Sequence, residues 1–221
     1  MKLNMRDSES VAMRHAMVAS QLRTNAVSDV RVVAAMDTVA REAFLPAELA
    51  SVAYRDTAVP LGHGRAQNVP MATGRLLTQA ELRADDRVLL IGAAGGYTAA
   101  VLAELVAEVV AVESDPTLAG FARAALAEVA AVTVIEGPLA AGHAAGAPYD
   151  VIVVDGAVED IPAGLIEQVA VGGRVVAGIL DRGVTRLSAG RRTAGGFGLL
   201  DFADIDCVTL PGFARPRTFT F

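Results

Sequence analysis

Short runs of β-branched residues alternate with helical segments along the chain from Arg87 onward. This alternation is typical of a parallel sheet with helices on its faces. The runs expected to form strands are Val88–Ile91, Val109–Glu113, Val132–Ile135, Val151–Asp155 and Arg174–Ile179. Between them, helices are expected over Tyr97–Ala107, Pro116–Val129 and Pro162–Val169. The pattern therefore predicts an α/β fold.

The segments on either side of this alternation have a different character. Apolar spacing predicts one helix from about Ser8 to Thr24 and a second that follows Ser28 and stops before Pro46. Residues 54–70 are rich in loop formers, and long loops inside compact domains are usually functional. After Leu180, residues 199–210 and 216–221 are expected to be extended and to form an antiparallel hairpin on the sheet edge. Residues 190–198 are either a hairpin turn or a lid.

Composition excludes several classes of protein. Of the 221 residues, 53% are hydrophobic and 20% charged, which rules out a disordered chain. The longest uncharged run, between Arg87 and Glu104, is shorter than the ~20 apolar residues of a membrane span and contains three glycines. The first residues lack the apolar stretch of a secretory signal. We therefore expect no membrane partner and a cytoplasmic location.

The charged and metal-binding residues also narrow the choice. The formal net charge is −6, and Arg191 with Arg192 and Arg215 with Arg217 are the only basic pairs, which fit a solvated surface better than a nucleic-acid site. Cys207 is the single cysteine and the three histidines are scattered, so we expect no disulfide and no metal site.

A turn of small residues follows the first predicted strand. It reads Gly92-Ala93-Ala94-Gly95-Gly96-Tyr97 and leads into a helix, so backbone can approach a ligand closely. Glu113 closes the next strand about 20 residues after Gly92, the spacing at which an acidic residue accepts hydrogen bonds from ribose hydroxyls. The glycines alone fit a tight structural turn equally well. Together with Glu113 they predict a nucleotide site at the carboxyl ends of the strands.

The identity of the nucleotide follows from what the turn lacks. The dinucleotide pattern G-x-G-x-x-G is not met, because Ala94 and Tyr97 occupy two of its glycine positions. A nicotinamide cofactor is therefore disfavoured. The turn is similar to the looser one that class I methyltransferases wrap around S-adenosylmethionine, which indicates methyl transfer.

Four stretches carry a resemblance that covers nearly the whole chain. They read MVASQLRTNAVSDVRVVAAMDTVAREAFLP, AYRDTAVPLGHG, VLLIGAAGGYTAAVLAEL and APYDVIVVDGAVEDIPAGLIEQVAVGGRVV. They resemble the N-terminal extension, the lead into the substrate loop, the cofactor turn and the fourth-to-fifth strand region of the protein-L-isoaspartate O-methyltransferase family. The resemblance implies a class I methyltransferase-like, doubly wound, mostly parallel sheet with a C-terminal antiparallel hairpin. It also implies a helical extension and substrate loop over residues 1–80, packed on a cofactor-binding core over residues 81–221 as one compact unit.

The resemblance further implies the site residues. S-adenosyl-L-methionine would be held by Gly92, Ala93, Ala94, Gly95, Gly96, Tyr97, Glu113, Ser114, Gly137, Pro138, Leu139 and Asp155. A protein or peptide substrate with an isoaspartyl carboxylate would meet His63, Asn68, Val69 and Pro70. Asn68 stands at the catalytic position of the loop, and no metal is implied.

Three departures from the family pattern fall at this site. The family loop reads T-I-S-Q-P, whereas residues 66–70 read A-Q-N-V-P, so Asn68 replaces the substrate-contacting serine. The family's G-D-G after the third strand is Gly137-Pro138-Leu139 here, which removes a carboxylate from the adenine side. Ala94 replaces the middle glycine of the turn. Unless Glu136 or a backbone group compensates, the lost carboxylate predicts cofactor binding roughly tenfold to hundredfold weaker.

The implied reaction needs no catalytic dyad. A free carboxyl has a pKa of about 3.3–3.9, so the nucleophile is already ionised at neutral pH and catalysis is mainly positioning, which can supply roughly 7–11 kcal/mol. Asn68 either donates an N–H to the substrate carboxylate or binds its own backbone. His63 either reaches the substrate or lies in water, and Asp155 either meets the reactants or caps a helix.

Three hypotheses remain open at this point. The first is an isoaspartate-repair carboxyl methyltransferase that uses S-adenosylmethionine. The second is a methyltransferase with a different acceptor, which the altered loop favours. The third is a non-catalytic binding protein on the same scaffold, which the losses at Ala94 and Pro138 favour.

Overall fold

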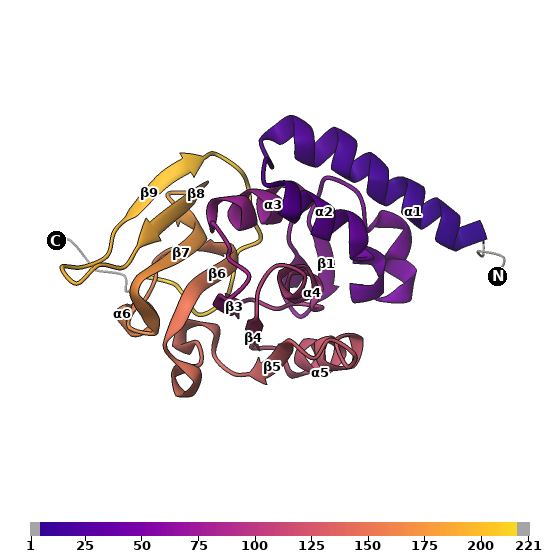
Figure 1. Ribbon diagram of the computed structural model, residues 1–221. Coiled ribbons are helices and arrows are strands. Elements are labelled where there is room, and N and C mark those ends of the chain that lie inside the picture. Colours follow the sequence, from indigo (N-terminus) through magenta and orange to yellow (C-terminus); the bar gives the residue numbers. More distant parts are fainter. Residues whose placement is uncertain (1–4, 216–221) are drawn as a thin grey trace.

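A seven-stranded sheet forms the centre of the computed structural model, which describes residues 5–215 (Figure 1). The strands are β3 (Arg87–Ile91), β4 (Glu108–Glu113), β5 (Val132–Glu136), β6 (Tyr149–Val158), β7 (Val169–Asp181), β8 (Val184–Arg191) and β9 (Leu199–Ala203). Their order across the sheet is β5-β4-β3-β6-β7-β8-β9. The first five are parallel to their neighbours, whereas β8 and β9 join as antiparallel strands. The predicted fold class, including the C-terminal antiparallel hairpin, is confirmed.

Helices and a small hairpin complete the fold. The α-helices are α1 (Met5–Met17), α2 (Val30–Thr38), α3 (Pro70–Gln79), α4 (Tyr97–Ala103), α5 (Pro116–Ala125) and α6 (Ala163–Ile166). A π-helical turn over Val18–Leu22 and a 3-10 turn over Arg23–Asn25 extend α1, and short 3-10 turns cover Arg41–Phe44, Ala47–Val52, Leu139–Ala141 and Ala144–Gly146. Strands β1 (Val59–Gly62) and β2 (Arg65–Gln67) pair antiparallel in a separate hairpin just before α3.

The alternation of side chains along each strand divides the core between the two faces of the sheet. Val88 and Leu90 of β3 pack with residues of α1 to α5 in the larger core. Leu89 and Ile91 point the other way and pack with the 3-10 turn at Leu139, with α6 and with the chain end around Leu210. Both faces are therefore buried, as the nearly unbroken apolar strands require.

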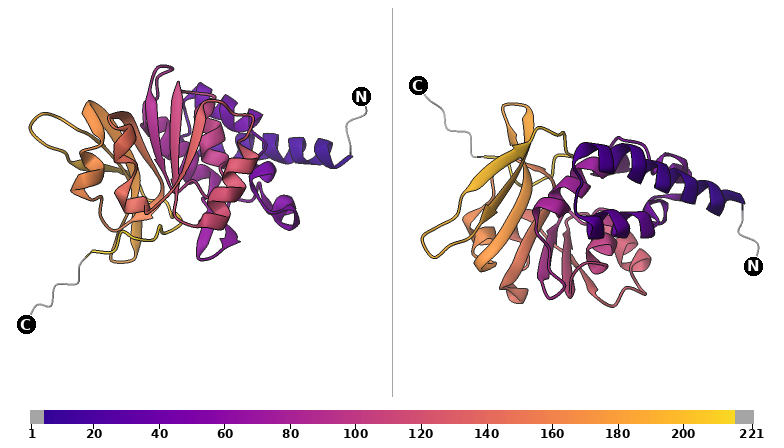
Figure 2. Two further views of the ribbon diagram at one scale, coloured as in Figure 1. Left: turned by 90° about the horizontal axis from the view of Figure 1, so that it is seen from below. Right: turned by 45° about the horizontal axis from the view of Figure 1, so that its top comes forward.

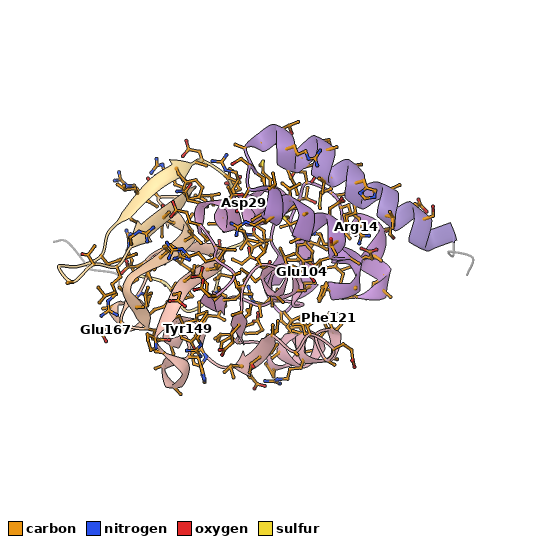
Figure 3. The ribbon with its side chains drawn as sticks, viewed as in Figure 1. Arg14, Asp29, Glu104, Phe121, Tyr149 and Glu167 are labelled. Atoms are coloured by element: carbon orange, nitrogen blue, oxygen red, sulfur yellow. The ribbon has the colours of Figure 1, made fainter. Side chains whose placement is uncertain are left out.

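The N-terminal helices lie over one face of the sheet. Figure 2 shows α1 extending outward beyond the body of the protein, while α2 and α3 lie between it and the sheet. Side chains fill the space between these layers (Figure 3). Asp29 caps α2 by accepting a hydrogen bond from the Arg31 amide. Of the helices described, none is long and apolar enough to cross a membrane.

Two expectations about the C-terminal part need correction. Strand β8 was not expected from the sequence; it pairs with β7 from Asp181↔Val184 to Arg174↔Arg191. The two-residue turn between them, Arg182-Gly183, has positive φ at both residues, as tight hairpin turns require. Residues 192–198 then connect β8 to β9, so this segment is a hairpin turn. The expected extended segment over 216–221 lies outside the described residues.

Helix lengths were also overestimated. Helix α4 ends at Ala103 instead of Ala107, α5 at Ala125 instead of Val129, and α6 has a single turn. Strands β6 and β7 are correspondingly longer than expected, and β7 begins at Val169. Alanine-rich sequence keeps a helical pattern beyond the residue at which the helix ends and the chain turns back to the sheet.

Candidate functional site

The small-residue turn lies where the strand order reverses. Strand β3 has β4 on one side and β6 on the other, and ligands of open parallel sheets bind at the carboxyl ends of the strands at such a point. The turn keeps a left-handed backbone at Gly92 (φ 88°), Ala94 (φ 49°) and Gly96 (φ 101°). A Cβ at Gly95 would lie 2.1 Å from the Phe44 carbonyl oxygen, so this glycine is needed for packing. We call the turn 92–96, Glu113 and Asp155 the carboxyl-edge site.

Glu113 at the end of β4 is bound by the chain itself. Its carboxylate accepts hydrogen bonds from Arg65 Nε (3.0 Å) and Nη2 (2.8 Å), and from the amide of Ala94 (2.7 Å). The amides of Ser114 and Asp115 donate to it at 2.8 and 3.1 Å. The side chains of Arg65 and Glu113 are only 3% and 0% exposed. Burial alone would raise the pKa of Glu113, but the hydrogen bonds and charge of Arg65 outweigh burial and lower it.

The segment around Leu210 packs against the turn from the other face of the sheet. The Leu210 side chain lies 3.1 Å from where a Cβ on Gly92 would stand, and 2.7 Å from a Cβ on Gly156. Backbone hydrogen bonds hold this segment in place, with the Leu210 amide donating to Ala157 (2.9 Å) and the Ala157 amide donating to Val208 (2.7 Å). Leu210 is therefore fixed against the backbone of the turn.

Asp155, directly after the last residue of β6 that pairs with β3, holds three polar side chains. Its Oδ1 accepts from Asn68 Nδ2 and Thr73 Oγ1, each at 2.9 Å, and its Oδ2 accepts from Thr98 Oγ1 at 2.5 Å. Asn68 Oδ1 accepts from the amides of Val69 (3.0 Å) and Val208 (3.2 Å). Asn68 thus binds its own backbone, as one sequence alternative had it, and also the strand-end carboxylate. Asp155 caps no helix, because its partners are side chains.

Arg41 is a buried residue at this site that sequence reasoning missed. Its side chain is 0% exposed, with Nε 2.8 Å from the Ala53 carbonyl and Nη2 bonded to the Asn68 carbonyl. The guanidinium lies 4.7 Å from the centre of the Tyr97 ring. Burial lowers the pKa of Arg41 and raises the pKa of Tyr97 to about 12. Nothing in the local sequence distinguishes this arginine from a surface one.

Several buried polar atoms on these segments have no hydrogen-bond partner. They are Arg41 Nη1, Arg65 Nη1, Gln67 Nε2 and Oε1, and Tyr97 Oη. Such atoms are rare in folded proteins because leaving them unpaired is costly. They mark the loop over residues 65–68 and the start of α4 as a polar region beneath the surface.

The other predicted site residues fall around this centre. His63 lies at the rim, 60% exposed, with Nδ1 3.2 Å from Asp115 Oδ2. The Gly137 amide donates to the Glu113 carbonyl (3.0 Å), Leu139 is buried in the core and Pro138 precedes its 3-10 turn. Val69 and Pro70 begin α3. Ala93 lies buried in the turn. The fold thus gathers the predicted cofactor segments at one sheet edge, with the loop 65–70 beside them.

The carboxyl-edge site does not fit an adenosyl group in this conformation. The carboxylate oxygens that would accept ribose hydroxyls are both bonded to Arg65, and Leu210 lies against the turn. Asp155 likewise accepts three hydrogen bonds from side chains of the chain itself. Across residues 5–215, no group of three His, Cys, Asp or Glu side chains is placed to hold a metal ion.

Comparisons with known proteins match this architecture. The sequence model of the protein-L-isoaspartate(D-aspartate) O-methyltransferase family matches residues 13–208. A protein-L-isoaspartate O-methyltransferase of Methanoculleus marisnigri is 43% identical over 74% of this chain and 76% of its own length. One from Methylorubrum populi is 39% identical over 90% and 95%.

Solved structures agree on the fold. A protein-L-isoaspartate O-methyltransferase structure aligns with a TM-score of 0.77 at 23% identity, over 90% of this chain and 66% of its own length. A Plasmodium falciparum structure assigned to the same enzyme type, solved with S-adenosyl-L-homocysteine, aligns with a TM-score of 0.74 at 17% identity, over 89% and 97%. At these identities the structures support the fold alone. On the extent of the sequence match, the chain belongs to the protein-L-isoaspartate(D-aspartate) O-methyltransferase family.

Proposed function

We propose that this protein is an S-adenosylmethionine-dependent carboxyl O-methyltransferase that acts on isoaspartyl residues of damaged proteins in the cytoplasm. The observation that carries the proposal is the extent of the family match, which runs over residues 13–208. It therefore includes the last part of α1, all of α2 and the loop over residues 65–70, and not only the sheet that many methyltransferases share.

The placement of the loop supports a protein substrate. Residues 65–70 run from β2 into α3 along the carboxyl edge, next to Asp155. Asn68 is held by Asp155 and by two backbone amides, so its position is fixed before any substrate arrives. A substrate carboxylate is already ionised at neutral pH and needs orientation by donors instead of a base. In this proposal, the loop and the buried Arg41 beneath it supply the positive and donor groups that attract the carboxylate.

A methyl-transfer assay tests the proposal. The protein is incubated with radiolabelled S-adenosylmethionine at millimolar concentration and with an isoaspartyl peptide, and base-labile methyl ester is counted. The control is the same peptide with a normal aspartyl residue. Ester formation on the isoaspartyl peptide alone is expected. Equal labelling of both peptides indicates a different acceptor class, and no labelling of either peptide contradicts the proposal.

A second candidate function is a non-catalytic binding protein. The observation that favours it is the Arg65–Glu113 pair, which fills the place of the ribose contact with a side chain of the chain itself. A ligand stabilises a protein only through the state that it binds. This candidate therefore predicts no change in melting temperature with millimolar S-adenosylhomocysteine, whereas the enzyme proposal predicts an increase.

A further inference from the structure

Arg65 occupies the carboxyl-edge site in a way that a solvent-facing arginine does not. Its guanidinium meets both Glu113 oxygens from a hairpin loop 48 residues earlier in the chain, and its side chain is 3% exposed. Its Nη2 also lies 3.4 Å from where a Cβ on Gly92 would stand, so the guanidinium reaches the first residue of the turn. The side chain thus binds Glu113 and lies beside the small-residue turn.

In the Arg65–Glu113 pair, Arg65 occupies the carboxylate oxygens that a bound ribose would contact. Glu113 is held in its charged form by three backbone amides as well as by Arg65. Without Arg65, Glu113 Oε1 would still accept from the amides of Ser114 and Asp115, whereas Oε2 would keep only the Ala94 amide and one free lone pair. A free lone pair on this carboxylate is what a ribose hydroxyl requires.

The hairpin that carries Arg65 is joined to the central sheet by side-chain contacts and not by strand pairing. Strands β1 and β2 are four and three residues long and pair only with each other. His63 and Gly64 at the hairpin tip both have positive φ and are exposed. Two-stranded hairpins are marginally stable by themselves. Val59 and Leu61 pack against the larger core, and the buried Arg65–Glu113 pair joins the hairpin to the end of β4.

From these observations, and on the basis of the proposed function, we propose that Arg65 is an internal occupant of the adenosyl site and holds it closed, so that the cofactor binds only when the β1–β2 hairpin moves and releases Glu113. Arg65 then competes directly with the ribose for the Glu113 carboxylate. The guanidinium acts as an autoinhibitory contact built into the fold.

Binding calorimetry with S-adenosylhomocysteine tests this inference on the full chain. Arg65→Ala and Arg65→Gln both remove the competing charge, and Gln keeps most of the side-chain volume in case the Ala variant does not fold. Each is expected to bind S-adenosylhomocysteine roughly tenfold to hundredfold more tightly than the unaltered protein, because a charge-assisted hydrogen-bond pair no longer has to be broken.

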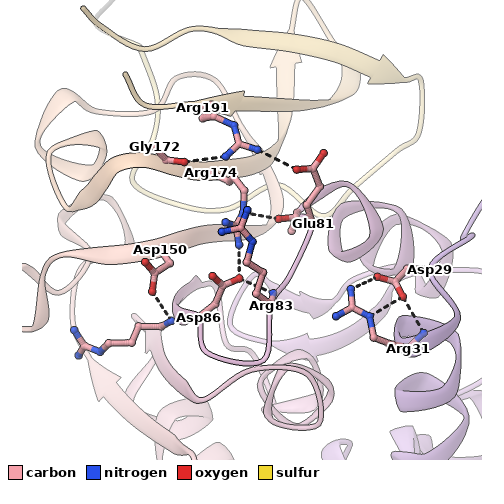
Figure 4. Close-up of polar contacts among 11 residues, drawn as sticks. Asp29, Arg31, Glu81, Arg83, Asp86, Asp150, Gly172, Arg174 and Arg191 are labelled. Carbon is pink, nitrogen blue, oxygen red and sulfur yellow. Dashed lines mark hydrogen bonds and ion pairs between the residues drawn. The ribbon is translucent and has the colours of Figure 1, made fainter. Parts of the chain in front are cut away.

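A matched control comes from the other end of the sheet. Arg174 forms a buried pair with Asp86 and also donates to the Ala80 carbonyl at 2.9 Å (Figure 4). Asp86, like Glu113, has backbone support, from the Arg83 amide at 2.7 Å. Arg174→Gln therefore disturbs a comparable buried ion pair away from the site, and its affinity for S-adenosylhomocysteine should equal that of the unaltered protein.

The outcomes separate this inference from the proposed function. Tighter binding in the Arg65 variants alone supports the inference. Equal and measurable affinity in all proteins, a gain shared by Arg174→Gln, or weaker binding in the Arg65 variants overturns it while the methyltransferase proposal stands. If neither the unaltered protein nor the Arg65 variants bind S-adenosylhomocysteine, both the inference and the methyltransferase proposal fail.

Discussion

Replacing Glu113 by Gln should be one of the most destabilising single changes in this protein. The substitution keeps the size of the side chain but leaves the Arg65 guanidinium, 3% exposed, without a counter-charge. Breaking a buried ion pair by removing one partner costs about 3–5 kcal/mol. For a domain of this length each kcal/mol lowers the melting temperature by about 2–4 °C, so a decrease of roughly 6–20 °C is expected.

A second Arg–Glu pair on the same two strands provides the control. Arg87 and Glu108 begin β3 and β4, and their side chains form a similar two-bond contact at 2.7 and 3.0 Å. These side chains are 37% and 44% exposed. Exposed pairs contribute about 0.2–1 kcal/mol, so Glu108→Gln should lower the melting temperature by at most about 4 °C.

Thermal melts measure the two decreases in melting temperature, and urea denaturation followed by circular dichroism measures the corresponding losses in free energy of unfolding. The free energy of unfolding is compared at constant slope, because a changed slope would report a change in compactness instead of stability. If Glu113→Gln costs no more than Glu108→Gln, burial does not determine the strength of these pairs. The Arg65–Glu113 pair would then not be the strong buried contact that its geometry at the carboxyl-edge site indicates.

Three other predictions concern acid, glycine and cysteine. The pKa of Glu113 is lowered in the folded state. Its charge therefore contributes fully to stability above the unfolded pKa of about 4.3, and this contribution is lost as the pH falls through the lower folded pKa. Glu113→Gln should flatten this acid dependence of stability in urea titrations between about pH 2 and 6. A Cβ added at Gly120 in α5 meets no atom within 4 Å, so Gly120→Ala should stabilise the protein by up to about 1 kcal/mol. A Cβ added at Gly95 meets the Phe44 carbonyl, so Gly95→Ala should destabilise it by about 1–3 kcal/mol. Equal effects of the two substitutions in thermal melts would contradict the packing argument. Burial raises the pKa of Cys207 to about 12, so a thiol reagent at pH 8 should modify the native protein far more slowly than the urea-unfolded one.

The sequence predicted the sheet well because its signal is local. Each parallel strand is an apolar run long enough to be buried on both faces, and Val88–Ile91 and Val109–Glu113 were placed to within one residue. Strand β8 was not predicted because it mixes Arg, Thr, Ser and Gly with few apolar residues. The Arg182-Gly183 turn was the one local sign of it.

The candidate site was predicted only in part. Spacing along the chain brought the turn and Glu113 together, because both follow strands that are neighbours in the sheet. Arg65 lies 48 residues from Glu113 and Asn68 lies 87 residues from Asp155, so no local pattern connects either pair. Which predicted residues contact a cofactor or a substrate stays a prediction.

The Arg65–Glu113 contact also sets a scale for the concentrations at which this protein can respond to a small molecule. A group tethered to its site by a short chain acts at an effective concentration on the order of millimolar or above. A freely diffusing nucleoside must exceed that local concentration, or bind through several additional contacts, before it replaces the arginine. This single side chain would therefore leave the site mostly unoccupied at low ligand concentrations, and the occupied fraction would rise only at high ones.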